Sequence, residues 1–193
     1  MRKIITTTMI TLDGVMQAPG GSKEDAAEGF KYGGWMVGWD VEADKITDRI
    51  QAVPFDLLFG RRTYDIFADF WPKHKDEPHW GKPYDRAKKY VVSHKPHKLP
   101  WNNSELITGD VVTEINKLKS SDGRDLWIWG SGNLIQTLLK HNLIDRMHLW
   151  IFPITIGSGK KLFSEVTQPV NFKLVEGKIL SSGIIFATYE PST

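Results

Sequence analysis

The sequence contains no cysteine among its 193 residues. This absence excludes disulfide bonds, thiolate metal ligands and cysteine nucleophiles. An excess of charge is also missing, because 25 basic and 23 acidic side chains leave a net charge of only +2. We therefore expect neither nucleic acid nor a membrane surface as a partner. No apolar run reaches the roughly 18 residues of a membrane span, and residues 1–6 do not resemble a secretory signal, so a cytoplasmic protein is expected.

Two kinds of catalytic site also lack support in the sequence. His94 and His97 are three residues apart, but they lie in a proline-containing segment with no evident carboxylate partner. We therefore expect no metal site. The Gly-x-Ser-x-Gly pattern of serine hydrolases is missing as well, so a hydrolase of that type has no support.

What the chain does contain is an alternation of strand and helix patterns in a composition of 40% hydrophobic and 25% charged residues, typical of one globular domain over residues 1–193. Strands are predicted at 3–10, 56–59, 89–93, 106–107, 126–129 and 146–156. Helices are predicted at 42–52, 61–70, 111–118 and 133–141. A closing hairpin is predicted from strands 172–180 and 184–189. This order predicts an α/β domain whose mixed sheet is parallel in the centre and antiparallel at one edge.

Two segments interrupt the alternation. Residues 14–39 are rich in glycine and are predicted to form a long loop with one short helix near 23–29, a candidate lid over a site. Its aromatic residues argue against disorder. Residues 73–84, directly after Pro72, contain two prolines and are predicted to be an irregular surface loop.

One candidate binding site lies where an apolar run ends in two glycines and a helical pattern begins. A strand that turns through glycines into a helix directs free backbone N–H groups, and the positive end of the helix dipole, at one point, which suits a phosphate or pyrophosphate. The alternative is a tight turn that simply needs glycine, since short glycine motifs are common. The Rossmann fingerprint is not met, because Ile135 occupies its last glycine position. The residues of this candidate site are Gly130, Ser131, Gly132, Asn133 and Leu134.

A second candidate has the same form at Gly60, Arg61, Arg62 and Thr63. Its arginines can hold phosphate oxygens in a fork, and the threonine can cap the helix or bind phosphate. The alternative is a solvated first helical turn. Arginine at a helix N-terminus opposes the dipole unless an anion compensates for it, which favours the binding interpretation. Two such turns suggest a nucleotide held at both.

Further candidates follow two other strands. Ser93 and Lys95 end a predicted strand and could hold a ribose 2′-phosphate, although a plain surface loop is the simpler interpretation. Asp13 and Gln17 follow the first strand. An aspartate before glycine is most often a turn residue, but at this edge of a sheet it could hydrogen-bond a polar heterocycle.

These motifs, taken in order, resemble those of a known family. Residues 60–64 resemble the Gly-Arg-x-Thr element of dihydrofolate reductases, residues 91–93 their strand ending in serine, and residues 130–132 their second glycine-rich turn. The whole chain, including segments 11–21 and 153–163, is similar to dihydrofolate-reductase-like proteins related to the reductase domain of bacterial riboflavin biosynthesis.

The resemblance implies a dihydrofolate-reductase-like three-layer α/β/α sandwich, with a mainly parallel sheet, that binds NADPH and forms a homodimer. Asp13 is implied to lie at the reacting groups. Cofactor contacts are implied for Gly60, Arg61, Arg62, Thr63, Ser93, Lys95, Gly130, Ser131, Gly132, Asn133 and Leu134. Substrate contacts are implied for Gln17, Tyr64, Phe67, Trp71 and Ile154, with the loop at Gly157 closing the pocket.

The predicted function is therefore NADPH-dependent hydride transfer to a C=N or C=O carbon of a small planar substrate such as a pterin or pyrimidinone, with the proton supplied through Asp13 or by solvent. Two alternatives remain: a module that binds a nucleotide or pterin without turnover, and, ranked last, a phosphate-binding transferase. The resemblance does not identify which of Glu42, Asp44 and Asp48 corresponds to the pterin-binding acid of dihydrofolate reductases, nor a basic group for a ribityl phosphate.

Overall fold

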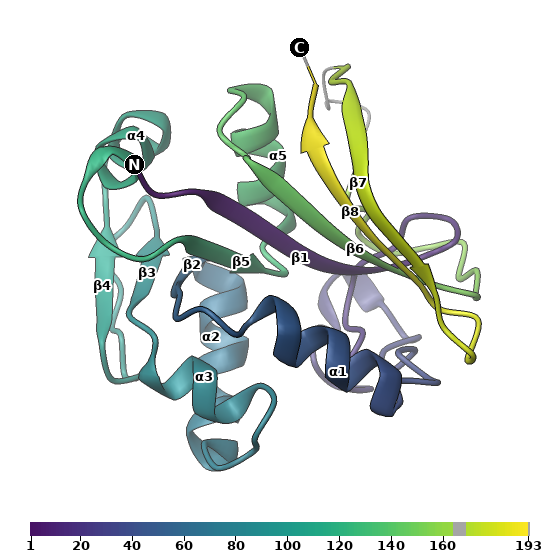
Figure 1. The fold of residues 1–193 in the computed structure, drawn as a ribbon. Coiled ribbons are helices and arrows are strands. Elements are labelled where there is room, and N and C mark those ends of the chain that lie inside the picture. Colours follow the sequence, from purple (N-terminus) through teal and green to yellow (C-terminus); the bar gives the residue numbers. More distant parts are fainter. Residues whose placement is uncertain (164–168, 193) are drawn as a thin grey trace.

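A single mixed sheet organises the computed structural model, which describes residues 1–163 and 169–192 (Figure 1). Its strands are β1 (Ile4–Thr11), β2 (Asp56–Gly60), β3 (Lys89–Val92), β4 (Ser104–Ile107), β5 (Leu126–Trp129), β6 (Arg146–Phe152), β7 (Phe172–Ile179) and β8 (Ile185–Pro191). The helices are α1 (Val41–Ile50), α2 (Arg61–Phe70), α3 (Gly81–Arg86), α4 (Val111–Ser120) and α5 (Gly132–Lys140), with the short 3-10 helices η1 (Ala27–Gly29) and η2 (Trp71–His74).

The strand order is β4-β3-β2-β5-β1-β6-β8-β7. Strands β4 through β6 in this order are parallel, and β8 and β7 are antiparallel to their neighbours. The predicted parallel centre and antiparallel edge are confirmed. Because six neighbouring strands run in the same direction, their carboxyl ends meet at one edge of the sheet.

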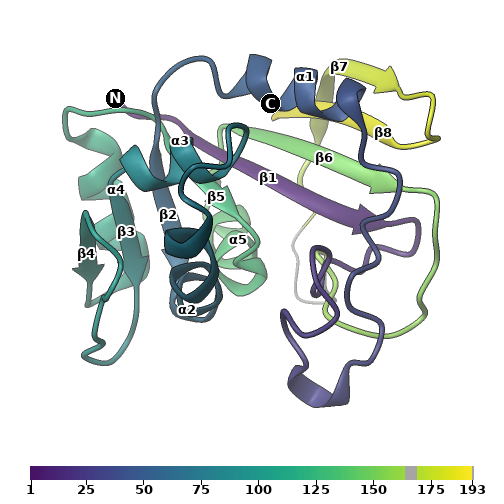
Figure 2. The same cartoon turned by 90° about the horizontal axis from the view of Figure 1, so that it is seen from below.

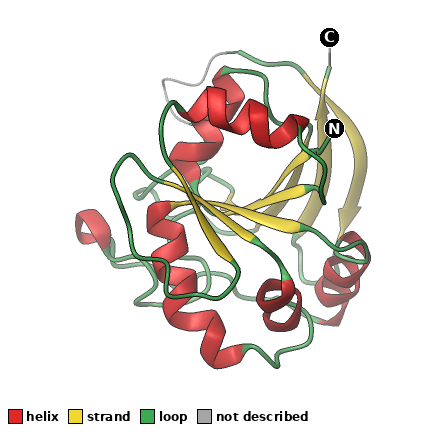
Figure 3. Cartoon of the chain, turned by 90° about the vertical axis from the view of Figure 1, so that its left-hand side faces the viewer, coloured by secondary structure: helices red, strands yellow, loops and turns green. Residues whose placement is uncertain are grey.

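Helices cover both faces of this sheet (Figures 2 and 3). Successive strand residues point to opposite faces: in β5, Trp127 and Trp129 belong to the core beneath α1, α2 and α3, whereas Leu126 and Ile128 belong to the core beneath α4 and α5. The predicted three-layer sandwich is confirmed. The first core is rich in aromatic rings and the second in aliphatic side chains.

The four helices of nine or more residues begin in two different ways. Asp40 caps α1 by accepting hydrogen bonds from the next backbone N–H groups, and Asp110 caps α4 in the same manner. The N-cap residues of α2 and α5, Gly60 and Ser131, supply no side-chain cap. The two predicted anion sites therefore coincide with the two helices whose first N–H groups are left without this cap.

Two predicted segments differ from the structure. Residues 73–84 are not wholly irregular, because they include part of η2 and the start of α3. The carboxylate of Glu77 accepts hydrogen bonds from the N–H groups of Trp80 and Gly81 and so caps α3, a local contact that the prolines obscured. The predicted strand 146–156 ends at Phe152, where Pro153 has no N–H group to continue the ladder. Residues 14–39 form a long loop containing η1, as predicted.

Within residues 1–163 and 169–192, no helix combines the length and apolarity needed to cross a lipid bilayer.

Candidate functional site

The two glycine-containing turns meet in space and hold each other. We call residues 60–63 the first corner and residues 130–134 the second corner. The N–H group of Gly60 donates to Ser131 Oγ at 3.0 Å, and the N–H group of Ser131 donates to Thr63 Oγ1 at 2.9 Å. The starts of α2 and α5 are thus joined by reciprocal hydrogen bonds at the carboxyl edge of the sheet.

Close approach explains the glycines of the second corner. Gly130 has φ +59°, and a Cβ atom there would lie 3.1 Å from Thr63 Cγ2. At Gly132 a Cβ atom would lie only 2.9 Å from Met16 Sδ. A side chain at Gly130 would crowd the Thr63 side chain of the first corner, and one at Gly132 would require the flexible Met16 side chain to move. Ser131 between them also has a left-handed backbone, with φ +54°, a conformation whose cost its two hydrogen bonds can offset.

The second corner presents backbone to solvent. Gly130, Gly132 and Asn133 are accessible, whereas Leu134 is buried and holds the first turn of α5 against the sheet. Because α2 and α5 begin side by side and their N-cap residues make no side-chain cap bond, their first N–H groups and dipoles suit an anion at this edge. The geometry fits the phosphate oxygens of a nucleotide.

The arginines of the first corner have protein partners of their own. Arg61 pairs with Asp65 at 3.0 Å within α2, and Arg62 Nε lies 3.8 Å from Asp25 in the long loop. Asp25 also accepts a 2.7 Å hydrogen bond from Lys160 Nζ. Burial raises the pKa of Asp25, but the hydrogen bond and charge of Lys160, with the charge of Arg62, lower it overall. Carboxylates therefore supply part of the compensation that the sequence analysis expected from a bound anion.

Asp13 ties the loop after β6 to the loop after β1. Its carboxylate accepts hydrogen bonds from the hydroxyl of Thr11 at 2.6 Å and from the N–H groups of Ile156 and Gly157 at 3.2 and 2.7 Å. These bonds, led by that of Thr11, lower the pKa of Asp13 to about 2. Asp13 is therefore a carboxylate at neutral pH, and its oxygens already have donors.

Gln17 is equally committed to the loops. Its Nε2 donates to the backbone oxygens of Asp25 and Ala27, and its Oε1 accepts from the N–H group of Lys160. The side chain is 3% exposed. In this arrangement Gln17 holds the long loop and the 157–162 segment together, using both N–H groups of its amide and one acceptor position of its oxygen within the protein.

The end of β3 lies at the same edge as the corners, since Val92 pairs with Gly60. There Ser93 is buried and its hydroxyl donates to the backbone oxygen of Lys95, while the Lys95 side chain is exposed. The structure thus brings Ser93 and Lys95 to the edge that carries both corners.

The aromatic candidates on α2 and η2 lie in the core or pack against it. Tyr64 is fully buried; its hydroxyl donates to Ser104 Oγ and accepts from the N–H group of Trp101. Phe67 and Trp71 pack around Tyr84, with ring centroids 5.9 and 5.1 Å away. Tyr64 therefore stabilises the layer under the first corner.

Ile154 and Gly157 belong to the loop after β6, which Asp13 holds through its hydrogen bonds. Ile154 is 38% exposed, and its backbone oxygen accepts a hydrogen bond from the N–H group of Leu12. Gly157, with φ +80°, is exposed. Both are accessible in the loop that Asp13 positions.

Several residues of this region had no individual signal in the sequence. Asp25 pairs with both Arg62 and Lys160 only because two distant loops converge, which no spacing along the chain reveals.

Four tryptophans also gather under α1 and α3: Trp39, Trp80, Trp129 and Trp150. The aromatic content of the long loop was the one available sign of them.

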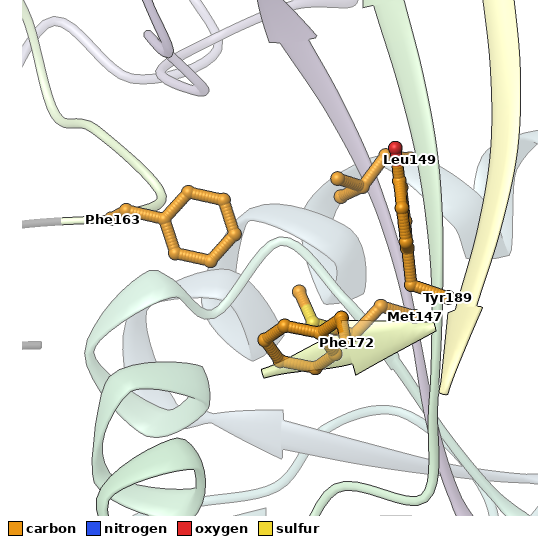
Figure 4. A pocket seen from close by; sticks show the side chains of 5 residues that line it. All are labelled: Met147, Leu149, Phe163, Phe172 and Tyr189. Carbon is orange, nitrogen blue, oxygen red and sulfur yellow. The ribbon is translucent and has the colours of Figure 1, made fainter. Parts of the chain in front are cut away.

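An apolar cavity of about 220 Å³ lies on the face of the sheet that α4 and α5 cover (Figure 4). It is lined by Met147, Leu149, Phe163, Phe172 and Tyr189. None of the predicted site residues borders it, and its lining provides little hydrogen-bonding capacity. No cluster of three or more histidine, aspartate or glutamate side chains suited to a metal ion occurs in the described residues 1–163 and 169–192.

The sheet order, the two joined corners and the helices on both faces define a dihydrofolate-reductase-like α/β protein. The chain belongs to the RibD C-terminal domain family, whose model matches residues 2–186. A curated relative, the uncharacterized protein YyaP of Bacillus subtilis (strain 168), is 31% identical over 97% of this chain and 94% of its own length.

Solved structures share the fold. A putative riboflavin biosynthesis protein from Shewanella sp. PV-4 aligns with a TM-score of 0.72 and 24% identity over 99% of both chains. Dihydrofolate reductase from Enterococcus faecalis, in complex with NADP(H) and RAB-propyl, aligns with a TM-score of 0.60 and 13% identity over 99% of this chain and 97% of that one. The fold and the family that the resemblance implied are confirmed.

Proposed function

We propose that this protein is an NADPH-dependent reductase that transfers hydride to a C=N or C=O carbon of a small planar substrate. The observation that carries the proposal is the pair of reciprocal hydrogen bonds that joins the uncapped starts of α2 and α5. Membership of a family named for a riboflavin biosynthesis domain, and a fold shared with a reductase solved with NADP(H), support the assignment.

The residues present fit such a cofactor. The backbone N–H groups at the two corners suit the pyrophosphate. Arg62, whose side chain is 58% exposed and held by Asp25 only at 3.8 Å, can turn to a phosphate oxygen. We assign Ser93 and Lys95, at the end of β3, to the ribose 2′-phosphate.

When bound, NADPH supplies the hydride. The chain's own contribution is to hold and orient the reacting groups and to exclude water. Asp13 holds the 154–157 loop in place as an ionised acceptor, and a carboxylate with a pKa of about 2 does not store a proton at neutral pH. Of the two proton sources considered, we therefore propose solvent.

The test is the double variant Arg61→Ala/Arg62→Ala. We expect NADPH binding to weaken by about 1–3 kcal/mol per lost charged hydrogen bond, with the fold intact, measured by calorimetric titration and far-UV circular dichroism. Arg49→Ala is the control, because Arg49, near the end of α1, is a similarly exposed arginine that forms an ion pair with Glu176 on β7 and belongs to neither corner. Unchanged affinity in the double variant contradicts the cofactor assignment.

A module that binds without turnover is the second candidate. It is favoured by the state of Asp13, the one proposed acid, which is ionised and already accepts three hydrogen bonds within the protein. Mixing the protein with NADPH and candidate pterins or pyrimidinones, while following the absorbance of the reduced nicotinamide, separates the two. Oxidation of NADPH supports the reductase, and tight binding without oxidation supports the module.

A further inference from the structure

We propose that Met16 is a site of reversible oxidation, and that its sulfoxide disturbs the start of α5 and so weakens cofactor binding at the second corner. The oxidant is a peroxide. The effect on the cofactor rests on the proposed function, whereas the oxidation and its effect on α5 do not.

No thiol competes for an oxidant in this chain. Its sulfur atoms belong to five methionines, because it has no cysteine, and peroxides convert methionine to the sulfoxide. Met9 and Met147 are 8% and 1% exposed, and Met1 is 93% exposed outside any helix or strand. Met16 and Met36 are partly buried. These two are therefore the methionines that are both packed against other residues and open to solvent.

Met16 lies against the second corner. Its Sδ and Cε atoms are the nearest atoms from outside that turn to Gly132, at 2.9 and 3.5 Å from the position that a Cβ atom would take there. Gly132 is the first residue of α5 and directly follows Ser131, whose N–H group donates to Thr63 in the first corner. The thioether therefore occupies the space that the missing side chain of Gly132 leaves beside the start of α5.

The backbone that carries Met16 is held in place on one side by the 157–162 segment. The N–H group of Met16 donates to the backbone oxygen of Lys160 at 2.8 Å. Val15, the preceding residue, is fully buried and forms an antiparallel bridge with Lys161. The backbone therefore cannot move aside without losing these contacts. A change in the size or polarity of the side chain acts on the second corner or on the position of the side chain itself.

The reaction transfers one oxygen atom from hydrogen peroxide to the sulfur. The sulfur loses two electrons, an S–O bond forms, the O–O bond breaks, and the second oxygen leaves as water. The product is a polar sulfoxide in place of an apolar thioether. Methionine sulfoxide reductases reverse the change, so the modification has the properties of a switch.

The sulfoxide fits poorly where the thioether packs. Met16 packs against the aliphatic core that contains Leu134 and Ile135 of α5, and a buried polar oxygen without a donor is costly. The start of α5 offers donors, because its N-cap residue, Ser131, makes no side-chain cap bond. The oxygen therefore either takes N–H groups that suit an anion or draws the side chain away from Gly132 into solvent. Both outcomes change the second corner.

The experiment treats the full chain with hydrogen peroxide and follows each methionine by peptide mass spectrometry. We expect Met16 to gain one oxygen at least tenfold faster than Met147. In the oxidised protein, hydrogen exchange of the backbone amides of residues 132–134 should change at least threefold in rate, measured without NADPH. NADPH affinity, measured by calorimetry, should fall at least fivefold, and treatment with methionine sulfoxide reductase should restore both properties.

Two variants assign the effect to Met16. Met16→Leu keeps a similar volume without the sulfur, so peroxide should change neither its amide exchange at residues 132–134 nor its own NADPH affinity. Met36→Leu is the matched control, because Met36 is also partly buried in the long loop but packs against the first core; it should respond to peroxide as the wild type does.

Oxidation of Met16 no faster than that of Met147, or the same response to peroxide in Met16→Leu as in the wild type, overturns the proposal. Unchanged amide exchange in the oxidised wild type overturns it as well. Absence of NADPH binding before treatment contradicts the proposed function alone, because oxidation and amide exchange are measured without the cofactor.

Discussion

Among single residues, two polar side chains predicted to contact a ligand, Asp13 and Gln17, form hydrogen bonds that connect loops of the protein. The side-chain oxygens of Asp13 and Gln17 accept hydrogen bonds from backbone N–H groups of the segment 156–160. Such contacts position neighbouring groups and leave little capacity for direct contact with a ligand. We therefore interpret both as positioning residues, while their predicted contact with a substrate stays a prediction.

Asp13→Asn tests this positioning. The amide offers one acceptor instead of two and presents an N–H group to the N–H donors of Ile156 and Gly157. We expect turnover to fall about tenfold, which corresponds to a loss near 1.4 kcal/mol, and NADPH affinity to fall by less. Backbone amide exchange at Gly157 should become faster. Asp110→Asn, which alters a remote helix cap, is the control. Equal turnover removes Asp13 from the mechanism.

The ionisation of Asp13 also predicts a pH dependence. Because its pKa is lowered from 3.8 to about 2 in the fold, its contribution to stability is present above about pH 4 and is lost as the pH falls through 2. Exchange at Gly157 in the wild-type protein should therefore accelerate in this acidic window, relative to other amides, and the Asn variant should not show that change. The same profile in both proteins contradicts the assignment.

At the element scale, the starts of α2 and α5 depend on each other. In neither does the N-cap residue make a side-chain cap bond, and each corner accepts a hydrogen bond from the other across the sheet edge. The cross-link holds the first N–H groups of both helices in one orientation. Pre-positioned donors of this kind bind an anion with little further loss of entropy.

Thr63→Val tests the cross-link. Valine keeps the shape of the side chain but gives the N–H group of Ser131 no acceptor. We expect the free energy of unfolding to fall by about 1–3 kcal/mol, measured by urea denaturation, together with weaker NADPH binding. Thr137→Val on α5 is the control, since its exposed hydroxyl only donates to the backbone oxygen of Asn133. Similar losses in both variants would contradict the role of the cross-link.

In the molecule as a whole, the parallel strands bring the loops that follow them to one edge of the sheet, and the antiparallel strands β8 and β7 form its last two strands. The segments after β1, β2, β3, β5 and β6 all reach the same edge. At the end of the sheet opposite β4, β7 is an edge strand with three exposed apolar side chains, Leu174, Val175 and Ile179. An exposed apolar edge strand favours pairing with another chain.

We propose that a second copy covers this edge, in keeping with the homodimer implied by the resemblance. Light scattering should give twice the chain mass of 22.0 kDa. Ile179→Lys should shift the equilibrium toward the single chain by placing a charge at the edge. Val53→Lys changes an equally exposed apolar residue, 75% against 77%, away from β7 and should leave the mass unchanged. A single-chain mass for the wild type contradicts the proposal.

Most of the helices and strands, and their order, could be predicted from the sequence. Apolar runs and glycine turns located the strands and the two corners, because strand burial and tight turns demand particular residues at short range. It failed where a contact between neighbours outweighed composition, as when Glu77 capped α3 in a proline-rich segment.

How these parts are joined follows from contacts between distant segments, which appear only in the folded chain. The pairing of Ser131 with Thr63, of Asp13 with Gly157 and of Trp39 with Trp150 links positions separated by 68 to 144 residues. Hydrogen bonds and ring contacts act over a few ångströms, and chain folding alone brings such positions within that range. The residue types at a site could therefore be inferred from the sequence, while the partner that each side chain takes could not.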